Sequence, residues 1–301
     1  MEELVYEGNC PFSWIRSADR MGLFPTIAAK IGGKPVNQII GATFGTFIFA
    51  VIYNLMQGIA LPTGSALIWS IISGIGWASA QILTFHSFTL IGSSGTMPIT
   101  TAFQLLGTSL WGVFALGDWP STNDKLVGFL ALALIVLGAW MTTWTEKKTD
   151  ENSAKLRKAV IVLLIGEIGY WAYSAAPQAA KIDGSKAFLP QAIGMCLVAI
   201  FYAIYLKVKN PNQAIALAQR ISYKQIISGF FFAFAALTYL ISAQPDMNGL
   251  ATGFILSQTS VVLATLTGIW FLHESKTKKE MIVTLVGLAI IIGAATMTVI
   301  V

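Results

Sequence analysis

Two nearly identical hexapeptides, AAKIGG at residues 28–33 and AAKIDG at residues 179–184, lie 151 positions apart in a chain of 301 residues. The tripeptide ISG at 72–74 also recurs, at 227–229, with an offset of 155 positions. Because these matches keep their order and nearly keep their spacing, they predict that the chain is built from two related halves.

The chain has too few charged residues to cover the surface of a soluble protein. Its residues are 55% hydrophobic and 11% charged, whereas a typical soluble domain is about 25% charged. The hydrophobic residues form long runs, each close to the roughly 20 residues that cross a bilayer as a helix. A bilayer core offers no partners to backbone polar groups, so we expect an all-α, polytopic membrane protein. The nine runs are 39–57, 66–90, 95–116, 126–144, 159–180, 187–206, 226–244, 249–272 and 281–300.

The number of runs in each half decides the predicted topology. Five of the nine runs fall in the second half, and the first of these, 159–180, ends at AAKIDG. AAKIGG should therefore close a matching first helix that ends near Ala29. An odd number of spans in each half makes the second half enter the membrane from the opposite side, which is typical of secondary transporters. We expect about ten transmembrane helices in two inverted five-helix repeats, residues 22–144 and 159–301, joined by a solvated cytoplasmic linker at 145–158.

The first helix is expected to be atypical or truncated. Arg16, Asp19 and Arg20 lie where the hydrocarbon core should be, and each costs about 2.5–3.5 kcal/mol near the bilayer centre. Only residues 21–29 are free of charge before the lysine of AAKIGG. Residues 1–21 are therefore expected to form an atypical N-terminal segment.

The distribution of basic residues predicts the orientation of the chain. If every run crosses the membrane, the loops on one face contain fourteen Lys and Arg residues and those on the other face contain three. The basic face should be cytoplasmic, which places the C-terminus outside the cell membrane. The net charge of +5 thus reflects topology, and we expect no nucleic-acid partner. The oligomeric state is left open.

Three stretches resemble a known family. They are GLFPTIAAKIGGKPVNQIIGATFG at 22–45, WASAQILTFHSF at 77–88 and GFILSQTSVV at 253–262. They are similar to the glucose/ribose uptake proteins of Gram-positive bacteria, within the drug/metabolite transporter superfamily, whose members have ten helices in two inverted halves. The resemblance implies uptake of a small neutral sugar such as glucose or ribose, coupled to protons.

Glu167 is the only Asp, Glu, Lys or Arg within the nine runs. An ionisable side chain inside a membrane is expensive and is usually functional. We interpret Glu167 as the group that binds and releases the coupling proton, and the alternative is a glutamate that faces water or pairs with a lysine.

A sugar site needs aromatic faces for C–H surfaces and amides that both donate and accept hydrogen bonds. The alternative for such side chains is a role in helix packing or in an interfacial belt. Two amides that follow Pro35 are expected either to cap the next helix or to line the cytoplasmic mouth: Asn37 and Gln38. The candidates for substrate binding are Trp77, Gln81, Gln104, Trp111, Trp171, Gln178, Tyr239 and Gln258.

No enzyme constellation, cofactor site or metal site is expected from the sequence. The chain has only two histidines and two cysteines, and we find no nucleotide-binding loop and no paired carboxylates at helical spacing. The leading hypothesis is a secondary transporter that works by alternating access. Two alternatives stay open, an exporter of drugs or metabolites from the same superfamily, and a remnant that does not transport because its first helix is damaged.

Overall fold

The computed structural model describes most of the chain as helices. It describes residues 13–146, 150–244, 246–258, 260–273 and 276–297, and only the backbone of residues 13–21, 249, 251, 254, 256, 258 and 295. The helices are α2 (Ser13–Ile31), α3 (Pro35–Gln57), α4 (Gly64–Trp111), α5 (Thr122–Thr142), α6 (Asp150–Ala179), α7 (Gly184–Lys209), α8 (Arg220–Lys224), α9 (Ile226–Ser242), α10 (Gly249–Gln258), α11 (Ser260–Phe271) and α12 (Lys278–Met297), with short turns η1 (Gly112–Leu116) and η2 (Ala216–Ala218).

The long helices confirm the prediction of an all-α, polytopic membrane protein. Each of the nine hydrophobic runs coincides with helix in the described residues. Six helical segments of the described chain are long and apolar enough to cross a membrane, and two further apolar segments, Gly22–Ile31 and Ser260–Phe271, are shorter. Many large hydrophobic side chains on these helices are exposed, which suits a surface that faces lipid rather than water.

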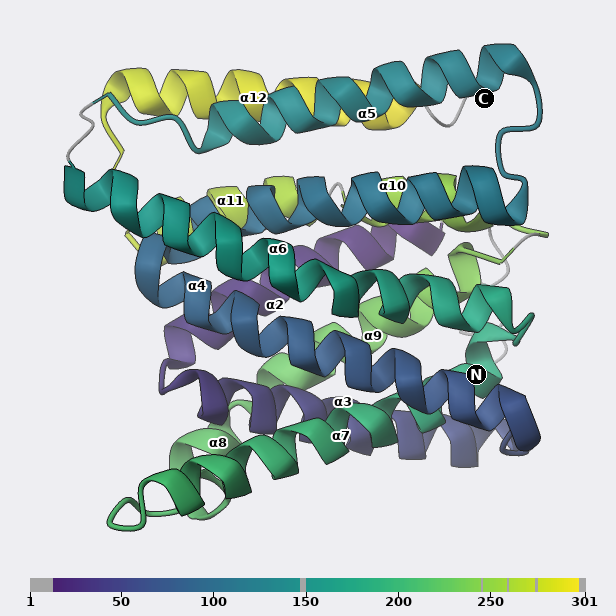
Figure 1. Cartoon of the computed structure of the whole chain (residues 1–301), viewed down its shortest axis with the longest axis vertical. Helices are drawn as coiled ribbons and strands as arrows, with labels where there is room; N and C mark the ends of the chain where they lie inside the picture. The colour runs from purple at the N-terminus through teal and green to yellow at the C-terminus, as the bar shows by residue number, and fades with distance from the viewer. Residues whose placement is uncertain (1–12, 147–149, 245, 259, 274–275, 298–301) are drawn as a thin grey trace.

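The 48 residues of α4 are two spans rather than one. Gly92 interrupts the helix with φ 72° and ψ 174°, a conformation that is open mainly to glycine. At this point the chain turns back on itself (Figure 1). The predicted separation of runs 66–90 and 95–116 is therefore correct, although the connection is a single residue.

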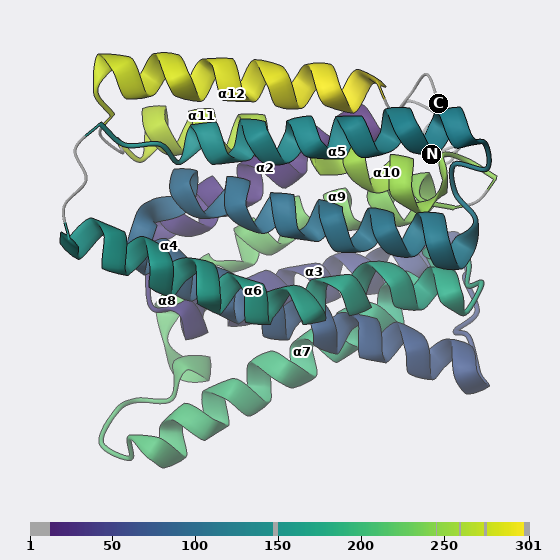
Figure 2. The same cartoon turned by 45° about the horizontal axis from the view of Figure 1, so that its top comes forward.

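Consecutive spans run in opposite directions through the bundle. We call one end the basic end: α2, α5, α7 and α11 finish there, and α3, α6 and α12 begin there (Figures 1 and 2). The connection from α2 to α3 lies at the basic end, and the connection from α6 to α7 lies at the opposite end (Figure 1). The two hexapeptides, each at a helix exit, thus lie at opposite ends of the molecule.

Four glycines allow two close helix crossings. Gly45 of α3 faces Gly229 of α9, and Gly74 of α4 faces Gly194 of α7, and a Cβ atom on any of them would collide with backbone of the facing helix. Gly229 follows Gly74 by 155 positions, and Gly194 follows Gly45 by 149. Both crossings join a helix of one half to a helix of the other, and the same kind of contact recurs between Gly76 and Gly169 and between Gly138 and Gly287.

The predicted linker at 145–158 is helical from Asp150 onward, where it forms the first turns of α6. Asp150 and Glu151 lie in the first turn, where negative charge interacts favourably with the helix dipole. Glu151 also pairs with Lys155 one turn later, at 2.6 Å. These residues are exposed, so this segment is a solvated extension of α6 rather than a loop.

The first helix is longer in the structure than its uncharged residues suggest. The helix α2 begins at Ser13 and contains Pro25, so residues 13–21 continue the short apolar segment Gly22–Ile31. Near the end of α2, the carbonyl oxygen of Ala28 accepts hydrogen bonds from the side-chain amides of Gln38 at 3.2 Å and Gln225 at 2.8 Å. The side chains of Arg16, Asp19 and Arg20 lie outside the described residues, and the prediction that they oppose insertion stays a prediction.

Candidate substrate and proton site

The inner face of α6 places polar side chains in the middle of the bundle. Glu167, Tyr170 and Tyr173 follow one another at intervals of three residues, which keeps them on one side of a helix. All three are buried, and Glu167 is 0% exposed. They face the two spans of α4 and the helix α9, so this face of α6 is the centre of the candidate site.

Glu167 is bonded to the second span of α4. The hydroxyl of Thr100 donates to Glu167 Oε1 at 2.8 Å, and Gln104 Nε2 donates to the same hydroxyl at 3.0 Å. The other carboxyl oxygen, Oε2, is buried and has no hydrogen-bond partner among the described residues. The alternative of a glutamate that faces water is therefore wrong, and no lysine or arginine of the described chain forms an ion pair with it.

Tyr170 is bonded to the first span of α4. Its hydroxyl donates to Gln81 Oε1 at 2.7 Å and shares a 2.9 Å hydrogen bond with Thr84. Because Tyr170 lies one turn from Glu167, the structure brings three predicted residues, Gln81, Gln104 and Glu167, around the same stretch of α6.

A second group of buried polar atoms lies further along α6. The rings of Tyr173 and Tyr239 have centroids 6.0 Å apart. Ser73 donates to the carbonyl of Tyr173 at 2.7 Å and accepts from Gln191 at 2.6 Å. The hydroxyl of Tyr173 and Gln191 Oε1 are buried without a hydrogen-bond partner in the described part of the chain. Such atoms are suited to the hydroxyl groups of a small polar molecule.

Trp77 lies in an aromatic cluster and not against the polar atoms. Its ring stacks on Phe232 with centroids 4.0 Å apart and an interplanar angle of 28°, and Phe24 lies at 6.2 Å. The side chain is only 3% exposed. In this conformation, packing is therefore the observed role of Trp77.

The structure separates Trp111 and Trp171 from the polar atoms. They line a small cavity of about 250 Å³ between the second span of α4 and α6. Trp171 Nε1 donates to the carbonyl of Phe103 at 3.1 Å, and Trp111 is 44% exposed. Although Trp111 and Gln104 share a face of α4, seven residues correspond to two helical turns, roughly 10 Å along the axis, so Trp111 lies away from the polar atoms around Glu167.

The remaining candidates lie near helix ends or outside the described side chains. Gln178 is buried at the last turn of α6. Asn37 caps α3 by accepting from the backbone of Lys34 at 2.9 Å, and its amide donates to Gln219 at 2.8 Å. Capping, one of the two expected roles, is thus observed for Asn37. The backbone of Gln258 ends α10, but its side chain lies outside the described residues.

Sequence reasoning missed Thr84, Thr100, Tyr170, Tyr173 and Gln191. The available signal was positional: Thr100 and Gln104 are four apart, and Tyr170 is three residues after Glu167. Residues at these spacings share a helix face. Helical spacing from Glu167 would have found the tyrosines on α6.

The comparisons with known proteins agree with the fold. Residues 19–301 match the family described as "Sugar transport protein". A protein of Lactobacillus johnsonii named "Putative ribose uptake protein RbsU" is 90% identical over 280 residues, which cover 93% of this chain and 95% of that protein. Proteins of the same name from Lactiplantibacillus plantarum and Enterococcus faecalis are 68% and 64% identical, with 92% of this chain and 94% of theirs covered.

A crystal structure of another protein, 16% identical, covers 95% of each chain with a TM-score of 0.65, which shows a shared fold. The family match spans nearly the whole chain and confirms the resemblance seen at residues 22–45. This chain is a multi-pass membrane protein that belongs to the sugar transport protein family.

Proposed function

We propose that this protein takes up a small neutral sugar, ribose in the first place, by symport with protons that move down their gradient. The observation that carries the proposal is the environment of Glu167, which is fully buried, bonded at one oxygen by Thr100 and without a partner at the other. Burying a carboxylate with so few partners costs free energy, and a bound proton removes the charge. Glu167 can therefore be charged or protonated, and the free-energy cost of the charged form depends on whether water reaches the site.

The residues around Glu167 suit a sugar. Gln81, Gln104, Tyr170 and Tyr173 are amide and phenol groups that both donate and accept hydrogen bonds. Several of their polar atoms satisfy one another in this closed arrangement. A sugar that entered between α4 and α6 would exchange these bonds for bonds to its own hydroxyls. The name of the relatives, which refers to ribose uptake, supports a pentose over a larger sugar.

Alternating access follows from the proposed symmetry of the two halves. We propose that residues 22–144 and 159–301 are inverted repeats. The opposite placement of the two hexapeptides and the paired glycine crossings support this. Inverted repeats allow one half to rock against the other around a fixed site. Loops at the basic end are proposed to face the cytoplasm.

The test is uptake of labelled ribose and glucose by vesicles that contain the purified protein, with and without an imposed pH gradient. The pH gradient is expected to drive accumulation in the native protein, and Glu167→Gln should lose that accumulation but keep exchange of labelled for unlabelled ribose. Glu151→Gln is the matched control, since Glu151 is an exposed glutamate on the same helix.

Accumulation that keeps its pH dependence in Glu167→Gln would overturn the role of Glu167. Efflux of an organic cation against its gradient, with no movement of either sugar, would favour the exporter instead.

A further inference from the structure

Two aromatic rings that stack inside the bundle come from corresponding positions of the two halves. Residues 72–77 read ISGIGW and residues 227–232 read ISGFFF, so Trp77 and Phe232 follow the repeated tripeptide at the same distance. Their rings stack with centroids 4.0 Å apart and an interplanar angle of 28°. Corresponding residues of two proposed repeats meet at the axis that relates the repeats, and inverted repeats hold their substrate near this axis. The stack therefore lies where a transported molecule is expected.

The two rings span a space between helices that are not packed closely on each other. In the described part of the chain, α4 and α9 make almost no close backbone contact. Trp77 and Phe232 fill this space together with Phe24 of α2, whose centroid lies 6.2 Å from the first ring and 5.3 Å from the second. Because side chains alone join α4 to α9 here, the two helices can separate without breaking a close backbone contact.

Polar groups flank the stack on both sides along α4. Ser73, Trp77 and Gln81 are four residues apart, so they lie on one face of that helix. One turn before the tryptophan, Ser73 accepts a hydrogen bond from Gln191 at 2.6 Å. One turn after it, Gln81 accepts from Tyr170 at 2.7 Å. An aromatic face between two groups of amides and hydroxyls matches a sugar ring, which has an apolar C–H face and polar edges.

The group around Ser73 has hydrogen-bonding capacity that the protein does not use. Gln191 is 0% exposed, and its Oε1 is buried without a partner among the described residues. The hydroxyl of Tyr173 is in the same situation. Unpaired buried atoms of this kind are rare, and a ligand is one way to satisfy them. Gln191 belongs to α7, so the second half supplies an amide as well as the ring of Phe232.

We propose that Trp77 and Phe232 form the aromatic platform of the sugar site, and that in this closed conformation each ring occupies the place of the sugar. This inference rests on the proposed function. When α4 and α9 separate, the face of Trp77 becomes free for the C–H face of a ribose ring, with Gln81 and Gln191 on its two sides for the hydroxyls. The stack closes the empty site, and the sugar replaces one aromatic contact with another.

The test is exchange of labelled for unlabelled ribose by vesicles that contain the purified protein, which gives a KM without a pH gradient. Trp77→Leu and Phe232→Leu keep an apolar side chain but remove a ring. Each should raise the KM for ribose by on the order of tenfold, the upper range for one aromatic contact, and should change the maximal rate less. Trp77→Phe keeps a ring and should keep a KM close to that of the native protein.

The matched control is Phe129→Leu, which removes a ring from another stack. Phe129 of α5 stacks on Phe114, with centroids 6.2 Å apart and an interplanar angle of 30°, away from the candidate site. The thermal midpoint should fall in both Phe129→Leu and Trp77→Leu, but only the second should have a raised KM. Gel filtration shows which variants stay folded, and Phe232→Leu carries the test if Trp77→Leu does not fold.

Ribitol, the open-chain alcohol of ribose, gives a test that needs no variant. It has the hydroxyls but no ring face, so it should compete for exchange much more weakly than ribose. A KM in both leucine variants no higher than in Phe129→Leu, an equal rise in Trp77→Phe and Trp77→Leu, or equal competition by ribitol would each overturn the platform and leave sugar uptake standing. A native protein that exchanges neither ribose nor glucose would overturn the proposed function, and this inference with it.

Discussion

The hydroxyl of Thr100 donates a 2.8 Å hydrogen bond to the carboxyl group of Glu167 across the interface between α4 and α6. The two residues are 67 positions apart, and both are buried. Gln104 extends this contact by one further hydrogen bond. The only Asp, Glu, Lys or Arg of the nine hydrophobic runs is therefore joined to a span that carries two polar groups suited to a sugar, Thr100 and Gln104.

Two tyrosines on α6 provide a matched comparison. Tyr170→Phe removes the bonds to Gln81 and Thr84, and the thermal midpoint should fall, since such bonds contribute roughly 0.6–1.7 kcal/mol inside membrane proteins. Tyr173→Phe should leave the midpoint unchanged, because its hydroxyl has no partner in the described chain. If a sugar uses that hydroxyl, Tyr173→Phe should instead raise the KM for ribose. A larger loss of stability in Tyr173→Phe than in Tyr170→Phe would contradict this assignment.

The glycine crossings predict opposite effects of the same substitution at two positions. Gly74→Ala places a Cβ against the backbone oxygen of Gln191, so it should destabilise by about 1–3 kcal/mol. Gly95→Ala meets nothing closer than 3.6 Å and should stabilise by roughly 0.5–1 kcal/mol. Thermal unfolding in detergent measures both, and an unaffected Gly74→Ala would show that α4 and α7 are not in close contact.

Cysteine labelling tests the orientation. In a background without Cys10 and Cys196, Ser153→Cys at the basic end should resist a membrane-impermeant maleimide in intact cells and react after lysis. Asn123→Cys, exposed at the opposite end, should react in intact cells. The reverse pattern would place the basic end outside and refute the proposed topology.

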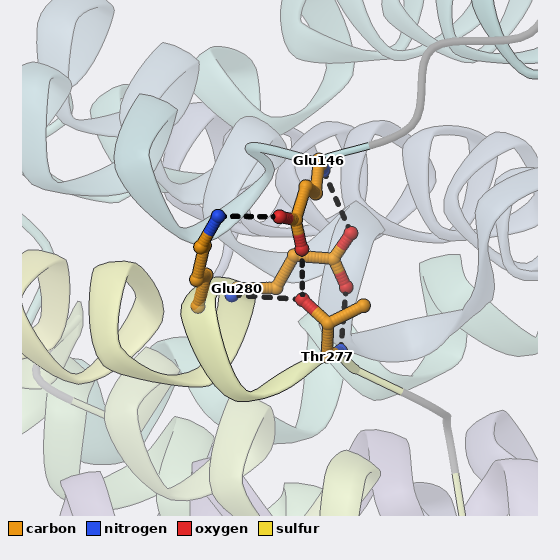
Figure 3. Close-up of polar contacts among 4 residues, drawn as sticks. Glu146, Thr277 and Glu280 are labelled. Atoms are coloured by element: carbon orange, nitrogen blue, oxygen red, sulfur yellow. Dashed lines mark hydrogen bonds and ion pairs between the residues drawn. The ribbon is translucent and has the colours of Figure 1, made fainter.

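The contacts between Glu146, just after α5, and the start of α12 (Figure 3) should be sensitive to acid. Hydrogen bonds from Lys279 and then Thr277 hold the pKa of Glu146 below its usual value of 4.5. A lowered pKa means that the contribution to stability is present above the unfolded pKa and disappears as the pH falls through the folded pKa. Glu146→Gln should therefore lower the thermal midpoint at pH 7, and the difference from the native protein should disappear as the pH falls through the lowered pKa of Glu146. A difference that persists in acid would mean that the charge is not its cause.

Replacing residues 1–21 tests whether the first helix limits function. A chimera in which an apolar helix like 159–172 replaces them should insert more completely, because Arg16, Asp19 and Arg20 each cost about 2.5–3.5 kcal/mol in the bilayer centre. Uptake of ribose per molecule should rise in the chimera. If the native chain transports equally well, its first helix is sufficient as it stands.

The sequence by itself determined the helices, their approximate limits and their membrane setting. Runs of apolar residues are a local property, and a bilayer forces each of them to satisfy its own backbone as a helix. Gly92 shows the limit of that reasoning. The sequence separated the two runs on either side of it, but it did not predict that one residue with a φ of 72° makes the whole turn between them. Residues 150–158 were predicted to be a linker and became helix, because the helix dipole and the Glu151–Lys155 pair favour continuation of α6.

The sequence also singled out Glu167, because one charge among apolar residues is visible without any fold. Only the tertiary structure decided what surrounds it. Thr100 and Gln81 come close to Glu167 and Tyr170 because α4 and α6 cross. Nothing local in the sequence distinguishes Thr100 from threonines that bond within their own helix, such as Thr43. The packing of α9 likewise buried Trp77 against Phe232. Helical spacing places side chains on a face, and the packing of helices distant in sequence determines which face each one meets.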